Sequence, residues 1–509
     1  RRCQWGRPPP RRREGQAMRG RPLAVRSTAD RGRILVTAAP LARGALVFEE
    51  EALLAAPDGG AIACLRCFRE VPEGTARLTC QDCGLPFCGP QCQAELKEVH
   101  VHECRLMRQL YKYLAPGSVT GGQAGTAVRI LCRAAAIRVV QPSVWERIRR
   151  LDTVALQPSE KLLAEAAARV AASIPSVSSV TSDDLLHVMA AAQCNSHDCH
   201  PQVPECGSDS DGLAALFALG SLLEHSCVPN CVKSSYMRDR DVVFQLRALR
   251  DVRAGESLTV AYVPLADPTH LRQEALRGRW GFRCRCARCS HPTELGSGIS
   301  SLRCGRCPRG HLAPTGGGGD AAEASWACGA CGRRRSREDV AAAEREMLAR
   351  VSRAEARGGA AWEELASALG ACRPRLHPNH WILFRCNYAL ATLRGGEPAD
   401  GRAGPLLRRA CEEGLRFCAL FGAPMLECAV HLQEALALLV LFGPPPPVAE
   451  RHEHYSEALR MHSLATNTST ALYGSHWAMR ELFQERTGLI LCCRDGRDQG
   501  VAEARLSRK

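Results

Sequence analysis

Eight potential metal ligands fall within one short stretch, and their spacing constrains the fold more than any other feature of this chain. The series runs C-x2-C-x12-C-x2-C-x4-C-x3-C-x7-H-x3-C, and its members are Cys64, Cys67, Cys80, Cys83, Cys88, Cys92, His100 and Cys104. A C-x2-C pair lets two thiolates bind one tetrahedral ion, and eight such ligands satisfy two zinc ions. The last two pairs place ligands four residues apart, on one face of a helix. The stretch therefore predicts a two-zinc finger.

The cysteine content as a whole is compatible with a secreted disulfide framework or with an intracellular zinc protein. The chain has 509 residues and 28 cysteines. Two later pairs, Cys304/Cys307 and Cys328/Cys331, have zinc-ribbon spacing. No apolar segment follows the arginines at 11–13, so we expect no signal peptide. Length and cysteine spacing therefore favour zinc over disulfides.

The formal charge of +14 overstates how basic the protein is, because it counts every cysteine as neutral. Binding of four zinc ions by fifteen thiolates would lower the charge to about +7. Such a balance favours acidic partners without indicating nucleic acid, so we expect no direct nucleic-acid binding. No apolar run of 18 residues occurs, so we also expect no membrane span. We expect a monomer in the cytoplasm, the nucleus or both.

Three further motifs occur in a fixed order and support a family resemblance. Ser221-Leu-Leu-Glu-His-Ser-Cys-Val-Pro-Asn230 is similar to S-L-L-N-H-S-C-x-P-N, and Gly255-Glu-Ser-Leu-Thr-Val-Ala-Tyr262 is similar to G-E-E-L-T-x-x-Y. Arg31-Gly-Arg33 resembles a K-G-R-G stretch, with Ile34 in place of the second glycine. These motifs, with the two-zinc finger, resemble the SET-and-MYND (SMYD) family of protein-lysine methyltransferases. The ribbon cysteines point to its arthropod SMYD-like branch, which resembles the fourth SMYD subgroup.

The resemblance implies a cofactor, S-adenosylmethionine (SAM), and a set of residues around it. The residues that it assigns to the cofactor are Arg31, Gly32, Arg33, Asn195, Glu224, His225, Tyr262, Trp280 and Phe282. Tyr262 is the expected catalytic residue, because methyl transfer needs an aligned amine and a phenol oxygen can orient one. The alternative is that Tyr262 merely ends a buried strand. Trp280 and Phe282 would form walls of the lysine channel.

The resemblance also implies how the metal ligands divide. In the finger, Cys64, Cys67, Cys88 and Cys92 would bind one ion and Cys80, Cys83, His100 and Cys104 the other. In the post-SET segment, Cys284, Cys286 and Cys289 would be joined by Cys227. We therefore expect three zinc ions, and a fourth at Cys304, Cys307, Cys328 and Cys331. Each set has four protein ligands, so the zinc is expected to be structural. MYND fingers of the family bind proline-rich peptides.

Two departures from the family leave the function open between alternatives. Glu224 stands where the family has Asn, and Trp280 stands where it has Tyr. A glutamate there could bind the ammonium of SAM or repel its carboxylate. The first hypothesis is a SAM-dependent protein-lysine N-methyltransferase that acts on histone or non-histone protein. The alternative is a catalytically inactive SET/MYND scaffold, and a third hypothesis is a zinc-dependent transcriptional regulator without a SET fold.

The expected fold is α+β: a SET β-fold split by a MYND zinc finger, followed by a post-SET zinc segment and a helical, tetratricopeptide-like C-terminal domain. An echo between Leu376-His-Pro-Asn-His-Trp381 and Leu472-Tyr-Gly-Ser-His-Trp477 suggests helix repeats, although chance explains so short a match equally well. Met18 is a plausible start of the natural chain, in which case residues 1–17 are an artefact of gene prediction. The expected segments are 1–20 disordered or mispredicted leader, 21–63 first part of SET, 64–104 finger, 105–190 helical insert, 191–265 SET core, 266–292 post-SET, 293–337 zinc-ribbon-like insert and 338–509 helical domain.

Overall fold

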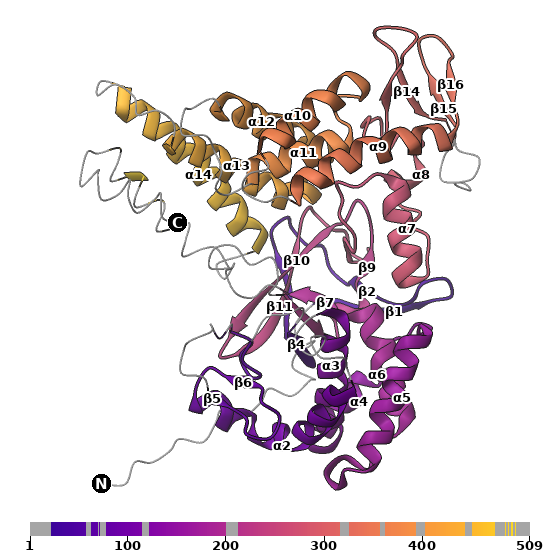
Figure 1. Ribbon diagram of the computed structural model, residues 1–509, viewed down its shortest axis with the longest axis vertical. Helices are drawn as coiled ribbons and strands as arrows, with labels where there is room; N and C mark the ends of the chain where they lie inside the picture. The colour runs from indigo at the N-terminus through magenta and orange to yellow at the C-terminus, as the bar shows by residue number, and fades with distance from the viewer. Residues whose placement is uncertain are drawn as a thin grey trace.

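The protein is a mixed α+β fold whose central strands lie between two groups of helices (Figure 1). The computed structural model describes residues 22–57, 63–69, 71, 78–113, 122–199, 212–315, 325–356, 362–392, 403–442 and 450–473, with five single positions between 484 and 494. The expected leader at 1–20 lies outside the described residues. The predicted α+β class is confirmed, as is a helical C-terminal region.

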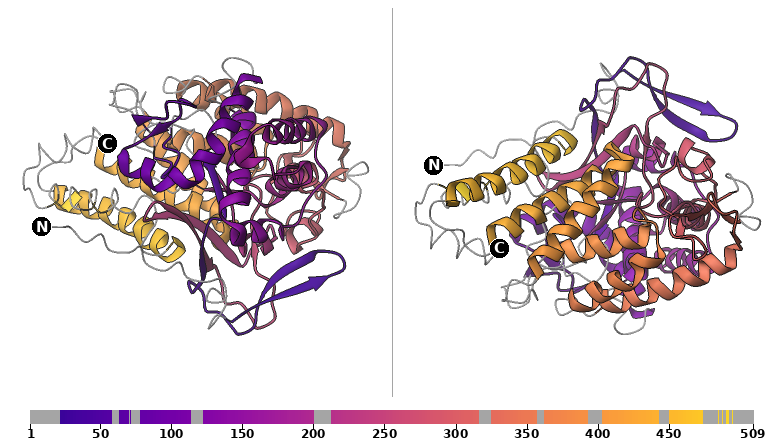
Figure 2. Two further views of the ribbon diagram at one scale, coloured as in Figure 1. Left: turned by 90° about the horizontal axis from the view of Figure 1, so that it is seen from below. Right: turned by 90° about the horizontal axis from the view of Figure 1, so that it is seen from above.

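The central strands form small antiparallel sheets around one core. Their order is β3 (Leu46–Glu51), β11 (Asp241–Ala248), β10 (Cys231–Arg238) in one sheet and β4 (Leu54–Pro57), β8 (Leu213–Leu216), β7 (His197–Cys199) in another. Strand β11 is apolar in consecutive positions because it is buried on both faces. Phe244 of β11 stacks on Phe48 of β3, with ring centroids 5.8 Å apart. The hairpin of β1 (Leu23–Thr28) and β2 (Gly32–Thr37) lies at the edge of the molecule (Figure 2).

One short strand joins the segments that carry the motifs. β12 (Thr259–Val260) runs parallel to β9 (Glu224–His225), and the residue before it, Leu258, donates its N–H to the Leu35 carbonyl of β2 at 2.8 Å. Asn230 is buried, and its side chain donates to the Ser257 carbonyl at 2.8 Å and accepts the Thr259 N–H at 2.8 Å. The N-terminal hairpin, the 221–230 motif and Tyr262 are therefore held side by side.

Five helices pack below the strands, in the orientation of Figure 1. They are α2 (Pro90–Tyr113), α3 (Gly122–Val140), α4 (Pro142–Ile148), α5 (Pro158–Ala172) and α6 (Ser182–Asn195). Their mutual contacts are rich in buried alanine, for example Ala134, Ala164 and Ala167, so the helix axes can approach closely. Thr181 accepts the Asp184 N–H at 3.1 Å and starts α6 with a capping box.

The remaining elements follow the strands in the chain and pack above them. They are α7 (Thr269–Trp280), α8 (Ala287–Ser290), β13 (Leu302–Arg303), β14 (His311–Pro314), β15 (Trp326–Cys328), β16 (Arg334–Arg335), α9 (Arg337–Glu355), α10 (Trp362–Cys372), α11 (Trp381–Thr392), α12 (Ala403–Phe421), α13 (Leu426–Phe442) and α14 (Arg451–Tyr473). From α9 to α14 each helix packs against the next along the chain. Tetratricopeptide-like repeats stay a prediction, because the second copy of the echo runs beyond the described residues. None of the described helices is both long and apolar enough to cross a membrane.

Candidate active site and metal centres

An aromatic cluster forms around Tyr262, from segments that are distant in sequence. Tyr262 follows β12, and its ring centroid lies 5.3 Å from His225, 5.1 Å from Trp280 and 6.5 Å from Phe282. Gly281 ends α7 in a left-handed conformation, with φ of 73°. This turn brings the side chains on both sides of Gly281 to the same tyrosine. The structure thus places the four predicted rings together.

Backbone groups hold the polar atoms of this aromatic cluster. The Tyr262 hydroxyl donates to the Leu223 carbonyl, and the Tyr262 N–H donates to Nδ1 of His225 at 3.0 Å. Burial raises the pKa of Tyr262, and the nearby Glu224 charge adds to the rise, so the phenol stays protonated at neutral pH. Burial also lowers the pKa of His225 to about 4, which keeps the imidazole neutral. The Trp280 indole N–H donates to the Cys194 carbonyl at 3.1 Å.

Glu224 forms an ion pair with Arg31 at the edge of this aromatic cluster. Nη1 of Arg31 lies 3.1 Å from Oε1 and 3.2 Å from Oε2 of Glu224, across 193 positions of the chain. The Arg31 side chain is 49% exposed and the Glu224 side chain 15% exposed. Gly32, with φ of 67°, makes the tight turn that carries Arg31. The carboxylate that departs from the family pattern therefore has a cationic partner.

Two other predicted cofactor residues are engaged elsewhere. Arg33 donates to Oδ1 of Asp152 at 2.9 Å and to the Arg150 carbonyl. The Asn195 side chain is buried, and its NH2 group donates to the carbonyls of Asp152 at 2.7 Å and Ala191 at 2.8 Å. Both side chains thus tie α6 and β2 to the loop after α4, and a direct contact of either with SAM stays a prediction.

The finger brings its eight predicted ligands together as two groups of four. The groups are Cys64, Cys67, Cys88, Cys92 and Cys80, Cys83, His100, Cys104, and the ligand atoms within each lie within 4.8 Å of one another. The second pair of C-x2-C cysteines is carried by the turn between β5 (Leu78–Thr79) and β6 (Pro86–Phe87). Helix α2 supplies Cys92, His100 and Cys104, so the helical spacing expected for His100 and Cys104 is confirmed. Cys88 lies before α2, and the prediction of a helix carrying both Cys88 and Cys92 is wrong.

Two residues that the sequence analysis did not assign support this finger. Nδ1 of His100 lies 3.0 Å from Oε1 of the fully buried Glu103, which leaves Nε2 directed at the thiols. Nε of Arg133 lies 2.6 Å from the same carboxylate. Burial by itself would raise the pKa of Glu103, but the Arg133 charge and the His100 contact outweigh it and lower that pKa to about 2. The only sequence signal was the position of Glu103 beside the last ligand.

Two further groups of four cysteines are also brought together. They are Cys227, Cys284, Cys286, Cys289 in the post-SET segment and Cys304, Cys307, Cys328, Cys331 in the sheet β13–β16. Their thiols lie within 4.8 Å of one another, so the chemistry and number of donors fit one tetrahedral zinc ion each. Gln273 positions the post-SET group: its amide donates to the Cys284 carbonyl at 2.7 Å and accepts the Cys284 N–H at 3.0 Å.

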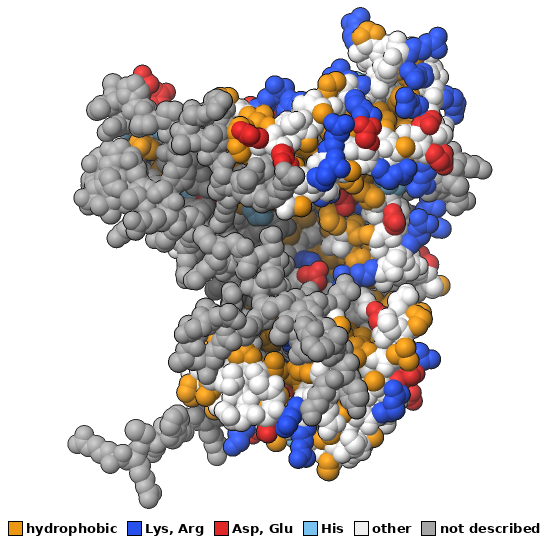
Figure 3. Space-filling view, viewed as in Figure 1, with side chains coloured by type: hydrophobic (Ala, Val, Ile, Leu, Met, Phe, Trp, Pro, Cys, Tyr) orange, Lys and Arg blue, Asp and Glu red, His pale blue; other side chains and the backbone are white. Residues whose placement is uncertain are grey.

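Basic side chains gather over the sheet β13–β16, at the upper right of Figure 3. Arg303, Arg306, Arg309 and Arg334 are exposed there.

Three cysteines near the SET motifs, Cys194, Cys199 and Cys206, are not among the predicted metal ligands. Cys199 is buried, Cys194 is half-buried, and neither belongs to a four-ligand group among the described residues; Cys206 lies outside them.

Comparisons with known proteins agree with this geometry. The family model of the SET domain matches residues 32–263. The chain is 28% identical over 285 residues to histone-lysine N-methyltransferase SMYD3 of Mus musculus, covering 52% of this chain and 60% of that protein. It is 25% identical over 350 residues to histone-lysine N-methyltransferase ASHR1 of Arabidopsis thaliana, covering 64% and 66%. It is 26% identical over 285 residues to the SET domain-containing protein SmydA-8, isoform A, of Drosophila melanogaster, covering 55% and 58%.

The chain therefore spans about three fifths of the length of these curated relatives. The matched SET segment begins at Gly32 in the hairpin and ends just after Tyr262. The chain contains a SET domain and is related to the SMYD proteins.

Proposed function

We propose that this chain is a SAM-dependent protein-lysine N-methyltransferase. The observation that carries the proposal is the half-buried Tyr262, whose ring lies among His225, Trp280 and Phe282 beside an ion pair of opposite charges. The methionine end of SAM carries both an ammonium and a carboxylate. Glu224 and Arg31 offer one complementary charge to each, so the residues present fit this cofactor.

Bound SAM would supply a methyl group on a sulfonium, and the chain's own residues would prepare the lysine. The aromatic walls desolvate an incoming amine, which disfavours its charged form and leaves it nucleophilic. The Tyr262 proton is committed to the Leu223 carbonyl, so the phenol oxygen keeps lone pairs that can accept an N–H of the amine. Because its pKa is raised, Tyr262 stays a neutral positioning group and is not the base that removes the amine proton.

The alternative function is a SET/MYND scaffold without catalysis. The same ion pair supports it, because Arg31 and Glu224 satisfy each other and a ligand must separate them. Calorimetry with SAM on the zinc-loaded chain distinguishes the two. Binding on the order of micromolar supports the enzyme, whereas no binding by the native chain and recovery in Glu224→Asn would establish the scaffold.

Methyl transfer gives the second test. With isotopically labelled SAM and a mixture of histone and non-histone proteins, the native chain should label lysine. Tyr262→Phe should keep SAM affinity and lose about 10²-fold or more of the transfer rate, because it removes only the oxygen that aligns the amine. Tyr236→Phe on β10 is the matched control, because it removes a hydroxyl that donates to Oε1 of Glu49 at 3.0 Å. Equal transfer by the two variants would exclude Tyr262 from catalysis.

The finer assignments belong to this proposal. The finger would bind proline-rich peptides, and the aromatic cluster around Tyr262 would bind a lysine of a histone or non-histone protein. The chain would act as a monomer, in the cytoplasm, the nucleus or both. The fourth cysteine group supports the arthropod SMYD-like branch. Pull-down with proline-rich peptide, compared with Cys88→Ser in the finger, tests the first of these partners.

A further inference from the structure

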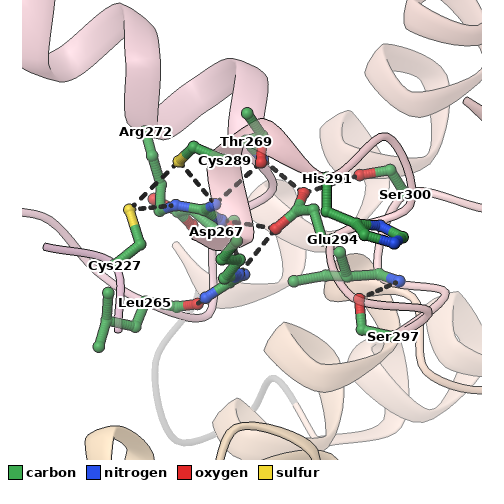
Figure 4. A network of polar contacts seen from close by, with 12 residues as sticks. Cys227, Leu265, Asp267, Thr269, Arg272, Cys289, His291, Glu294, Ser297 and Ser300 are labelled. Atoms are coloured by element: carbon green, nitrogen blue, oxygen red, sulfur yellow. Dashed lines mark hydrogen bonds and ion pairs between the residues drawn. The ribbon is translucent and has the colours of Figure 1, made fainter. Parts of the chain in front are cut away.

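Two arginines and one glutamate are buried together beside the post-SET cysteines (Figure 4). Arg272 and Arg288 are 0% exposed and Glu294 is 3% exposed. Oε2 of Glu294 accepts from Nη1 of Arg272 at 2.9 Å and from Nε of Arg288 at 2.8 Å. One carboxylate therefore balances only one of the two buried cations, and the second charge needs another partner.

The second partner is the cysteine group itself. Nε of Arg272 donates to Sγ of Cys227 at 3.1 Å, and Nη2 donates to Sγ of Cys289 at 3.4 Å. Four thiolates around one Zn²⁺ leave an excess of negative charge in a buried place. A guanidinium that donates to two of the sulfurs offsets that excess, in the way that outer-shell groups tune metal sites.

The backbone at Glu294 shows that its carboxylate is held firmly in place. Glu294 and Leu295 both adopt left-handed conformations, with φ of 49° and 61°, although neither is glycine. Such a conformation persists only where other contacts over-determine it. Here the carboxylate also accepts the Thr269 N–H at 2.7 Å and the Ser300 hydroxyl at 3.4 Å. Leu295 is 56% exposed, so its side chain does not account for the turn.

Arg288 extends the cluster to the C-terminal helices. Its guanidinium lies over the Phe421 ring, 4.0 Å from the ring centroid, and donates to the Leu265 carbonyl at 2.7 Å. Phe421 is the last residue of α12. A line of contacts therefore runs from the half-buried Phe421 through Arg288, Glu294 and Arg272 to the post-SET sulfurs.

We infer that Arg272 is a positioning residue for the post-SET metal site, where its charge sets how firmly zinc is held, and that Phe421 couples the C-terminal helices to that site through Arg288 and Glu294. The inference rests on zinc binding by the four post-SET cysteines. It goes beyond the proposed function, because it holds whether or not the chain transfers methyl groups.

The test is the alkylation rate of individual cysteines in the full-length zinc-loaded chain, measured with N-ethylmaleimide and peptide mass spectrometry. In Arg272→Met, the post-SET cysteines should react about 10–100-fold faster than in the native chain. The finger and ribbon cysteines of the same molecules should keep their native rates and serve as internal controls. Arg272→Lys keeps the positive charge and should stay much closer to native.

A second pair of variants tests the coupling. Phe421→Leu should accelerate alkylation of the post-SET cysteines about threefold, because it removes only the ring under Arg288. Phe384→Leu is the control, since that ring lies on α11 and stacks on Phe417, with ring centroids 4.2 Å apart. Native rates in Arg272→Met, equal rates in Arg272→Lys and Arg272→Met, or acceleration of every cysteine group alike would overturn the role of Arg272. Equal effects of Phe421→Leu and Phe384→Leu would overturn the coupling.

Discussion

Glu50 holds the backbone just before the 221–230 motif, and its titration should be visible in the free energy of unfolding of the protein. Its buried carboxylate accepts the N–H groups of Leu219 at 3.0 Å and Gly220 at 2.6 Å, where η2 (Gly220–Leu222) leads into Glu224. Burial raises the pKa of Glu50 from 4.5 to about 7, although the two N–H groups oppose the rise. The folded chain therefore binds this proton more tightly than the unfolded chain. The stability that Glu50 contributes is fully present below pH 4.5 and is lost as the pH rises through 7.

The loss between pH 6 and pH 8 amounts to about 1.3 kcal/mol. Glu50→Gln cannot titrate, so the native chain should lose about 1.3 kcal/mol relative to this variant over that interval. Urea titrations of both zinc-loaded proteins at each pH measure the change, and groups common to the two cancel in the difference. Glu51→Gln, an exposed neighbour in β3, is the control. A difference between native and Glu50→Gln that stays constant within about 0.3 kcal/mol would refute the reasoning.

Three further predictions concern metals and packing. A Cβ at Gly310 would lie 2.4 Å from two ribbon sulfurs, so Gly310→Ala should lose one zinc equivalent by elemental analysis, whereas Gly329→Ala, with nothing within 4 Å, should keep it; equal zinc contents would argue against the fourth site. A Cβ at Gly298 would lie 2.5 Å from the His377 ring, so Gly298→Ala should cost about 1–3 kcal/mol more than Gly296→Ala, which has only the left-handed backbone; coincident unfolding curves would disprove the clash. Removing all zinc with a chelator should unfold the finger, since closed sites contribute folding free energy; an unchanged circular dichroism spectrum would contradict this.

The sequence predicted most reliably what depends on local spacing. A pair such as Cys80/Cys83 can reach one ion whatever the rest of the chain does, so the C-x2-C pairs were foreseeable from spacing, whereas Cys227 and the division of the finger's ligands into two groups followed only from the family resemblance. The partner of Glu224 was not, because Arg31 reaches it only after β12 has paired with β9 and the preceding residue, Leu258, has bonded to β2. Asn195 illustrates the same limit, since its amide groups are engaged by a loop 43 residues earlier in the chain.

In two of the metal centres, the surrounding charged side chains match the excess charge of the ligand set. A site with three thiolates and a histidine has one excess negative charge on zinc, and His100 in the finger is held by Glu103, whose own charge is balanced by Arg133. A buried site with four thiolates has twice that excess, and there Arg272 lies directly on the sulfurs. In the finger the Glu103 carboxylate lies between His100 and Arg133, so a cation one shell farther from the ligands suffices there. An unpaired carboxylate next to the post-SET thiolates would add like charge in a buried place. Glu294 is not unpaired there, because Arg288 is held on it in addition to Arg272.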